Sequence, residues 1–83
     1  MFSKPKTLIF DFGKEKIIPL HMLFVFFPID VLFLDKNKKV AEIKENFKPF
    51  SFYNPKNKAR YIIELPFNTI KNSGTKSGDK ISF

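Results

Sequence analysis

The feature that most constrains this chain is the apolar stretch from His21 to Asp35, HMLFVFFPIDVLFLD. A helix that crosses a membrane needs about 20 consecutive apolar residues with few charges. This stretch is shorter, and Pro28 and Asp30 interrupt it. A charged Asp30 near its middle would be costly in lipid. The stretch therefore predicts buried β-strands that break near Pro28, and no membrane segment.

Length and composition exclude several kinds of site. The chain has 83 residues, which predicts a single small domain of modest stability over residues 1–83. It contains no cysteine, so disulfides, thiolate–metal sites and cysteine nucleophiles are excluded. His21 is the only histidine, and it cannot form a multi-histidine metal site alone. We expect no metal or other cofactor and, because the first residues do not resemble a secretory signal, a cytoplasmic location.

Strands dominate the predicted secondary structure. In residues 40–47 the alternation predicts Val40 and Glu42 on one face and Ile43 on the other. Gly13 is expected to stop the first strand, and a turn over residues 35–38 is expected to join two strands in a hairpin. Short β-branched and aromatic runs predict the strands themselves, at residues 7–12, 17–22, 31–34, 40–47, 59–65 and 80–83.

One segment predicts a helix. Residues 68–73 are typical of a single helical turn, with Asn68 as N-cap and Gly74 at the C-terminal cap. Gly78 is expected in a turn just before the last strand. Residues 48–58 contain two prolines and two asparagines, and they predict a connection without regular structure.

Three motifs, in order along the chain, resemble those of domain-of-unknown-function family 192 (DUF192). Residues 28–35, PIDVLFLD, are similar to the family's P-L-D-[IV]-[IL]-F-[IL]-D, and residues 59–66, ARYIIELP, to its A-R-Y-V-L-E-L-P. Thr69 and residues 74–79, GTKSGD, resemble its closing G-T…G-I-K-x-G-D. Asn68 stands where the family has glycine, and asparagine tolerates the left-handed conformation.

The resemblance implies a mainly β fold, a small antiparallel β-sandwich or barrel of jelly-roll type with one short helix, and no particular activity. Two departures from the family pattern matter. His21, Phe24 and Val25 stand where the family has Trp, Asn and Thr, so polar groups that could line a site are absent. Family members usually begin upstream with a further strand, so the resemblance also implies either that Met1 is an internal methionine of a longer gene product or that this chain lacks the family's first strand.

A sheet without its first strand exposes unpaired N–H and C=O groups at one edge. We therefore expect this chain either to self-associate through an open edge or to be markedly less stable than a version extended upstream of Met1. The candidate edges are residues 7–12, 17–22 and 81–83.

Six residues are expected to be structural. Asp30 is expected to accept backbone N–H bonds and hold a bend, and Asp35 to lie in a turn. Along an extended strand the two carboxylates are about 16 Å apart, too far for a catalytic pair, which needs about 5 to 9.5 Å. His21 is interpreted as a core or edge histidine. The complete structural set is Pro28, Asp30, Asp35, Gly74, Gly78 and Asp79.

The candidate binding residues lie between positions 47 and 60. Aromatic rings interleaved with cations are typical of a platform for single-stranded nucleic acid, where bases stack and lysines hold phosphates. The other interpretation is that these rings close the open end of the sandwich. Arg60 is the only arginine among fifteen basic residues, and lysine is mainly a solubilising charge. The candidate residues are Phe50, Phe52, Tyr53, Lys56, Lys58 and Arg60.

The sequence favours a non-enzymatic module that binds a small ligand or a protein partner through one end of the sandwich. The net charge of +7 is interpreted as a solvated lysine surface. The first alternative is a nucleic-acid-binding module that uses residues 47–60, with weak affinity. The second alternative is an enzyme with Asp30 and His21 near a pocket.

Overall fold

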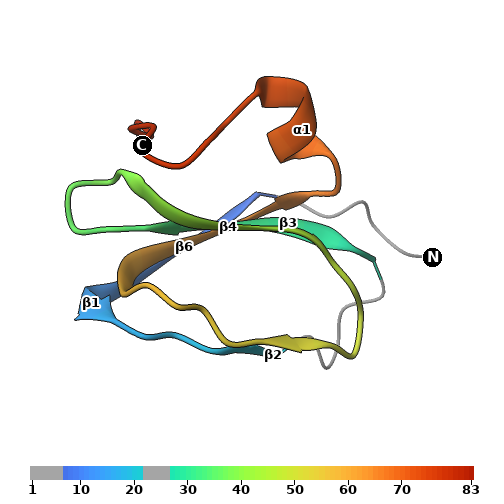
Figure 1. Ribbon diagram of the computed structural model, residues 1–83, viewed down its shortest axis with the longest axis horizontal. Coiled ribbons are helices and arrows are strands. Elements are labelled where there is room, and N and C mark those ends of the chain that lie inside the picture. Colours follow the sequence, from blue (N-terminus) through green and yellow to red (C-terminus); the bar gives the residue numbers. More distant parts are fainter. Residues whose placement is uncertain (1–6, 22–26) are drawn as a thin grey trace.

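The computed structural model describes residues 7–21 and 27–83. The described residues form six β-strands and one short helix (Figure 1). In chain order these are β1 (Leu8–Lys16), β2 (Leu20–His21), β3 (Ile29–Leu34), β4 (Val40–Phe47), β5 (Phe52–Tyr53), β6 (Ala59–Pro66) and α1 (Thr69–Ser73).

The strands form two antiparallel sheets. The larger sheet has the order β1-β6-β3-β4, and the smaller one pairs β2 with β5. The small sheet lies over one face of the large sheet, while α1 and the C-terminal segment, residues 76–83, lie over the other (Figure 1). The predicted mainly β fold with one short helix is confirmed. No helix among the described residues is long and apolar enough to cross a membrane.

The continuous apolar run of β3 is explained by burial on both faces. Val31 and Phe33 point toward the small sheet and pack with Phe47. Leu32 and Leu34 point toward α1 and pack in a second cluster. Successive residues of a strand face opposite sides, so a strand covered on both sides needs apolar residues at nearly every position. Asp30 is the exception.

Two predicted strand ends are wrong. β1 does not stop at Gly13 but continues to Lys16. Gly13 has a φ of 81° and lies in an irregular part of the β1–β6 pairing, where a glycine lets the strand bend without ending. β3 begins at Ile29, so Asp30 lies inside a strand and not at a bend. Of predicted strand 17–22, only Leu20–His21 is a strand among the described residues.

The predicted faces of β4 are also wrong. Phe33 pairs with Glu42 and Leu34 pairs with Val40, so β4 has one residue more than β3 at this point. This β-bulge places Val40 and Glu42 on opposite faces. Val40 and Ile43 both pack in the cluster beneath α1. The predicted hairpin between β3 and β4 is confirmed.

The predicted connection at residues 48–58 contains β5. Residues 80–83, in contrast, form no strand, and only an isolated bridge joins Lys39 to Lys80. The C-terminal segment makes its backbone hydrogen bonds with the β3–β4 hairpin near its turn, including one from Ile81 N to the Lys38 carbonyl of 2.9 Å. These few contacts hold the segment against the sheet without extending it.

The N-terminus of helix α1 is capped by a side chain from another element and not by its own N-cap residue. Asn68 occupies the N-cap position with a left-handed φ of 72°, but its side chain makes no capping hydrogen bond, contrary to a normal N-cap. The amide of Ile70 instead donates to the Asp30 carboxylate, which belongs to β3. At the other end Gly74 has a φ of 72°, and its amide bonds the Ile70 carbonyl, as expected for a helix C-terminus.

Candidate functional site

Two of the predicted binding residues lie on the surface at one end of the sandwich. Phe50 follows β4 and Phe52 begins β5, and each is 68% exposed. Phe50 has a φ of 61°, a conformation that is strained for a bulky residue. An exposed aromatic ring on a strained backbone is a feature of binding sites, because such strain persists only where the surroundings impose it.

Tyr53 belongs to the core instead. Its ring centroid lies 5.8 Å from that of Phe33 and 6.5 Å from that of Phe47. Its hydroxyl donates a hydrogen bond to Glu42. The Lys44 ammonium lies 5.4 Å from the Tyr53 ring centroid. Tyr53 therefore joins the two sheets and does not extend the aromatic surface of Phe50 and Phe52.

Glu42 anchors β5 and the loop that follows it, a role that the sequence analysis did not predict. Besides the Tyr53 hydroxyl, Glu42 Oε1 accepts hydrogen bonds from the backbone amides of Lys56 and Asn57 and from the Asn57 side chain, each 2.9 Å long. Partial burial raises the pKa of Glu42, but the hydrogen bonds from Tyr53 and Asn57 outweigh it and leave this pKa below its usual value. The hydrogen bond from the Tyr53 hydroxyl to Glu42 also raises the pKa of Tyr53 to about 12. A glutamate in an alternating strand gives no sequence signal for such a role.

The basic residues of the predicted site do not converge. The side chains of Lys56 and Lys58 are exposed, while Arg60 belongs to β6 in the other sheet. Its guanidinium bonds Asp11 of β1 through Nε at 2.9 Å and Nη2 at 3.2 Å, and this pair lowers the pKa of Asp11 and raises that of Arg60. The structure thus leaves Phe50 and Phe52 exposed but places Arg60 in an ion pair with Asp11.

Asp30 is completely buried, and both of its oxygens are occupied. Oδ1 accepts the Asn46 amide and Oδ2 accepts the Ile70 amide, each at 3.0 Å. Pro28 directly precedes its strand. A carboxylate in this position has no access to a substrate, which argues against the predicted enzyme site. His21 pairs with Phe52 through its backbone, and its side chain lies outside the described residues.

The remaining predicted structural residues lie in turns. Asp35 Oδ1 accepts the amides of Asn37 and Lys39 at 2.8 and 3.0 Å. Asp79 Oδ2 accepts the Lys76 amide at 2.9 Å, and Gly78 has a φ of 91°. Their importance for stability stays a prediction. Within residues 7–21 and 27–83, no cluster of three His, Cys, Asp or Glu residues could hold a metal ion.

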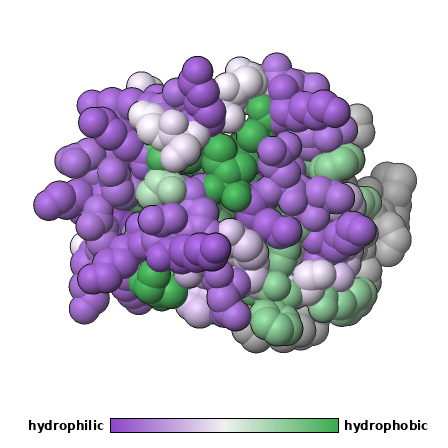
Figure 2. All heavy atoms as spheres, viewed as in Figure 1, coloured by the Kyte–Doolittle hydropathy of each residue, from purple (hydrophilic) through white to green (hydrophobic). Residues whose placement is uncertain are grey.

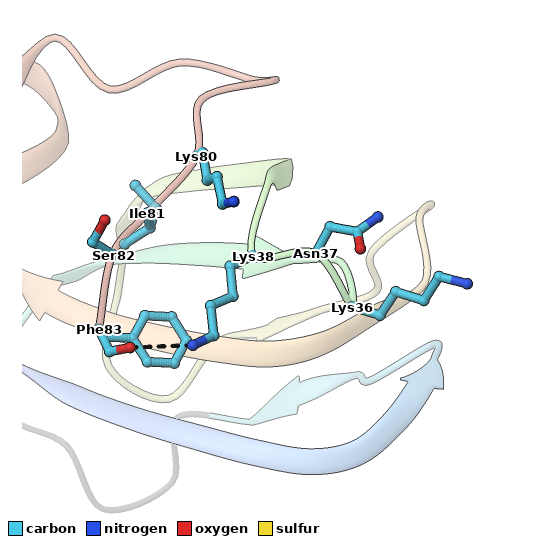
Figure 3. Close-up of a pocket in the computed structure, with 7 residues that line it drawn as sticks. All are labelled: Lys36, Asn37, Lys38, Lys80, Ile81, Ser82 and Phe83. Atoms are coloured by element: carbon cyan, nitrogen blue, oxygen red, sulfur yellow. Dashed lines mark hydrogen bonds between the residues drawn. The ribbon is translucent and has the colours of Figure 1, made fainter.

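A hollow at the turn of the β3–β4 hairpin is lined by basic residues, but one of them, Lys38, already contacts Phe83 (Figure 3). It has a volume of about 380 Å³ and includes Lys36, Lys38, Lys80 and Phe83. The Lys38 ammonium donates to the Phe83 carbonyl at 3.1 Å and lies 4.2 Å from the Phe83 ring centroid. Lys36 extends away from Phe83 (Figure 3). The lysines therefore do not point toward a common ligand position.

An apolar hollow, which we call the α1 groove, lies on the other face of the large sheet from β5. Its volume is about 280 Å³. In the view of Figure 2 hydrophobic side chains show between polar atoms in the region between α1 and the C-terminus. The groove is lined by Thr7, Ile9, Leu32, Ile63, Leu65, Thr69, Ser73, Thr75, Ile81, Ser82 and Phe83.

The α1 groove combines an aliphatic floor with a rim of hydroxyl groups. β-Strands supply the floor, while α1 and the C-terminal segment supply most of the rim. The Thr69 hydroxyl donates to the Pro66 carbonyl at 2.6 Å, and the hydroxyls of Ser73 and Thr75 are 2.7 Å apart. These contacts fix the hydroxyl positions. Apolar walls with a few fixed polar groups are typical of small-molecule sites.

Sequence reasoning missed the α1 groove because its lining comes from five separate segments. Leu32 and Ile63 were expected to be buried in strands, and Thr69 and Thr75 belong to the helical turn and the glycine motif that follows it. No run of residues marks the groove. Only the strand order β1-β6-β3 places Ile9, Ile63 and Leu32 side by side.

The two packed sheets with α1 define a small β-sandwich protein, and comparison with known sequences places it in a family. The model of the family DUF192, described as "Uncharacterized ACR", matches residues 2–83. A UPF0127 protein of Pyrococcus furiosus is 40% identical over 86 residues, which span all of this chain and 73% of that protein. The chain belongs to the DUF192 family.

Other relatives are considerably longer than the matched region. A UPF0127 protein of Thermococcus sibiricus is 41% identical over 64 residues, which cover 77% of this chain and 41% of that protein. Among solved structures, a Sinorhizobium meliloti protein described as a candidate transcription regulator has a TM-score of 0.86 and 27% identity, and the match covers 96% of this chain and 64% of that one. The chain thus spans less than two thirds of either protein.

A second solved structure supports the fold alone. A protein of unknown function from Novosphingobium aromaticivorans has a TM-score of 0.86 at 19% identity. The match covers 100% of this chain and 61% of that one. The two proteins therefore share the same fold although most of their residues differ.

Proposed function

We propose that this protein is a non-enzymatic binding module that holds a small, mostly apolar ligand in the α1 groove. The observation that carries the proposal is the aliphatic floor of the groove beneath a rim of fixed hydroxyls. The floor belongs to a hydrogen-bonded sheet, so the site is formed before the ligand arrives. A preformed site avoids the cost of ordering residues on binding.

The size and chemistry of the groove define the class of ligand. A volume of about 280 Å³ is just below the range of ligand pockets, which span about 300–1,000 Å³, so the ligand must be small. Aliphatic side chains such as Ile63 and Leu65 favour an apolar body, because burying apolar surface yields about 25 cal/mol per Å². Rim hydroxyls such as that of Thr75 donate to or accept from one or two ligand oxygens. A short-chain or cyclic alcohol or ketone has this composition.

A substitution that fills the α1 groove will test the proposal. Ser82 is exposed at its rim, so Ser82→Trp places a large ring over the floor without removing a core side chain. We expect cyclohexanol to shift the amide signals of Ile63 and Leu65 in the original protein, and Ser82→Trp to weaken this binding at least tenfold. Two-dimensional NMR titration measures both effects.

The matched control for the groove is Asn54→Trp, at an exposed position between β5 and β6. This variant should bind cyclohexanol as the original protein does. Shifts confined to the end of the sandwich near Phe52 would place the ligand there instead. Equal affinity in Ser82→Trp would exclude the α1 groove as the site.

Nucleic acid is the second candidate ligand, because Phe50 and Phe52 are exposed on a surface with a net charge of +7. We expect single-stranded oligothymidine to bind weakly and to dissociate as salt rises to about 150 mM, since lysine–phosphate contacts depend on counterion release. Fluorescence anisotropy of a labelled oligonucleotide measures this. Phe52→Ala should weaken the low-salt binding, and Phe67→Ala should not. Tight, sequence-dependent binding that survives salt would make nucleic acid the leading function.

A further inference from the structure

The strand β1 forms one edge of the large sheet. It pairs with β6 on one side, and no strand in the part of the chain that the structure describes pairs with its other side. All nine of its residues are exposed. Leu8, Ile9 and Phe10 are 48%, 45% and 42% exposed. An exposed apolar edge strand is a template for pairing with another strand.

The opposite edge of the same sheet, β4, is protected. It carries the charged residues Glu42, Lys44 and Glu45. Its pairing with β3 is irregular at two positions, and Asn46 has a φ of 52°. Charges and bulges of this kind prevent edge-to-edge pairing. In β1 the first charge comes only at Asp11 and the irregular pairing only after it, so Leu8, Ile9 and Phe10 form an apolar edge that no other described strand pairs with.

We propose that β1 pairs antiparallel with β1 of a second copy of this chain, around a two-fold axis that passes beside Ile9. In this register Ile9 faces Ile9 of the partner copy, and Leu8 faces Phe10. Apolar side chains then meet on both faces of the extended sheet. The same surface patch serves both copies, which is the isologous arrangement of most homodimers. The result is a continuous eight-stranded sheet.

Charge affects both the register and the strength of the dimer. An axis at Asp11 would place two carboxylates opposite each other, which is unfavourable. An axis at Ile9 places Asp11 opposite Thr7, a residue that can donate a hydrogen bond to it. Each copy carries a net charge of +7, so the copies repel each other at low ionic strength, and salt screens this repulsion. The dimer should therefore become stronger as salt rises, opposite to nucleic-acid binding.

A pair of short strands makes a small interface, and stable specific complexes usually bury more than about 1,000 Å². We therefore expect a reversible dimer with a dissociation constant on the order of 10 µM. Sedimentation equilibrium in 300 mM salt will measure it. Phe10→Lys should raise the dissociation constant at least tenfold, because a lysine at an edge opposes pairing.

The matched control is Phe67→Lys, at a residue 45% exposed outside β1, which should dimerise like the original protein. Thermal melts will verify that both variants are folded. A protein that stays monomeric at 500 µM would overturn the proposal. So would a folded Phe10→Lys variant that dimerises normally.

Cysteine cross-linking tests the register separately, because the chain has no native cysteine. In the proposed dimer, Ile9→Cys brings the two Cβ atoms to about 5 Å, close enough for a disulfide after a small adjustment. A cysteine at Phe12, in the same strand, lies six residues from its copy along the paired strands, about 20 Å away. Mild oxidation should cross-link Ile9→Cys at least tenfold more than Phe12→Cys. Equal cross-linking would contradict the register.

Discussion

Replacing Asp30 with alanine will lower the free energy of unfolding by about 2–4 kcal/mol, because one buried and one partly buried hydrogen bond to its carboxyl group are lost at once. The carboxylate is completely buried and accepts the amides of Asn46 and Ile70. Without it the Ile70 amide stays buried without an acceptor, while the Asn46 amide is only partly buried. Urea unfolding followed by circular dichroism will measure the change.

Asp35→Ala is the matched control, because Asp35 also accepts two backbone amides, those of Asn37 and Lys39. Both of those contacts are exposed to water, which replaces the lost acceptor, so we expect a loss of about 1 kcal/mol or less. If Asp30→Ala does not fold, Asp30→Asn keeps one acceptor and gives a smaller, measurable loss. An Asp30 variant as stable as Asp35→Ala would exclude the structural role.

Asp30 connects β3 to two distant parts of the chain, and one of them, α1, forms part of the α1 groove. Its partner amides are 16 and 40 residues away in the chain, one at the irregular end of β4 and one in α1. The bond to Ile70 fixes the first turn of a helix of only five residues. Such a short helix is unstable alone. Asp30 therefore helps to hold the wall of the groove in place.

The fold was largely predictable because its signals are local. The apolar run before Asp35, the turn over residues 35–38 and the alternation of residues 40–47 predict the central hairpin from short-range patterns. The family resemblance adds the class of fold, a small antiparallel β-sandwich with one short helix. The left-handed conformation of Asn68 agrees with its residue type, which tolerates this conformation where the family has glycine. These features depend on neighbouring residues.

The errors come from features that depend on residues far apart in the sequence. The bulge in β4 is set by its pairing with β3, and one extra residue moves Glu42 to the other face. Gly13 gives the same local signal in a turn and in a bent strand. The α1 groove needs three adjacent strands and two covering segments. No window of the sequence contains that information.

Replacing Glu42 with alanine will lower the free energy of unfolding at pH 7 by about 2 kcal/mol, since a carboxylate that accepts several hydrogen bonds is lost. Its partners Tyr53, Lys56 and Asn57 belong to β5 and the loop that follows it. This loop should then become less ordered. Thermal melts will measure the loss, and Glu45→Ala, at an exposed position of the same strand, should cost much less.

The effect of Glu42 depends on pH with a definite sign. Hydrogen bonds hold the pKa of folded Glu42 below its usual 4.5, despite the opposing effect of partial burial. A carboxylate with a lowered pKa stabilises the fold above its unfolded pKa, and this contribution is lost as the pH falls through the folded pKa. Melts between pH 7 and pH 3 should therefore show the difference between the original protein and Glu42→Ala narrowing below about pH 4.5. A difference that stays constant down to pH 3 would mean that the charge of Glu42 contributes nothing to holding β5 against β4.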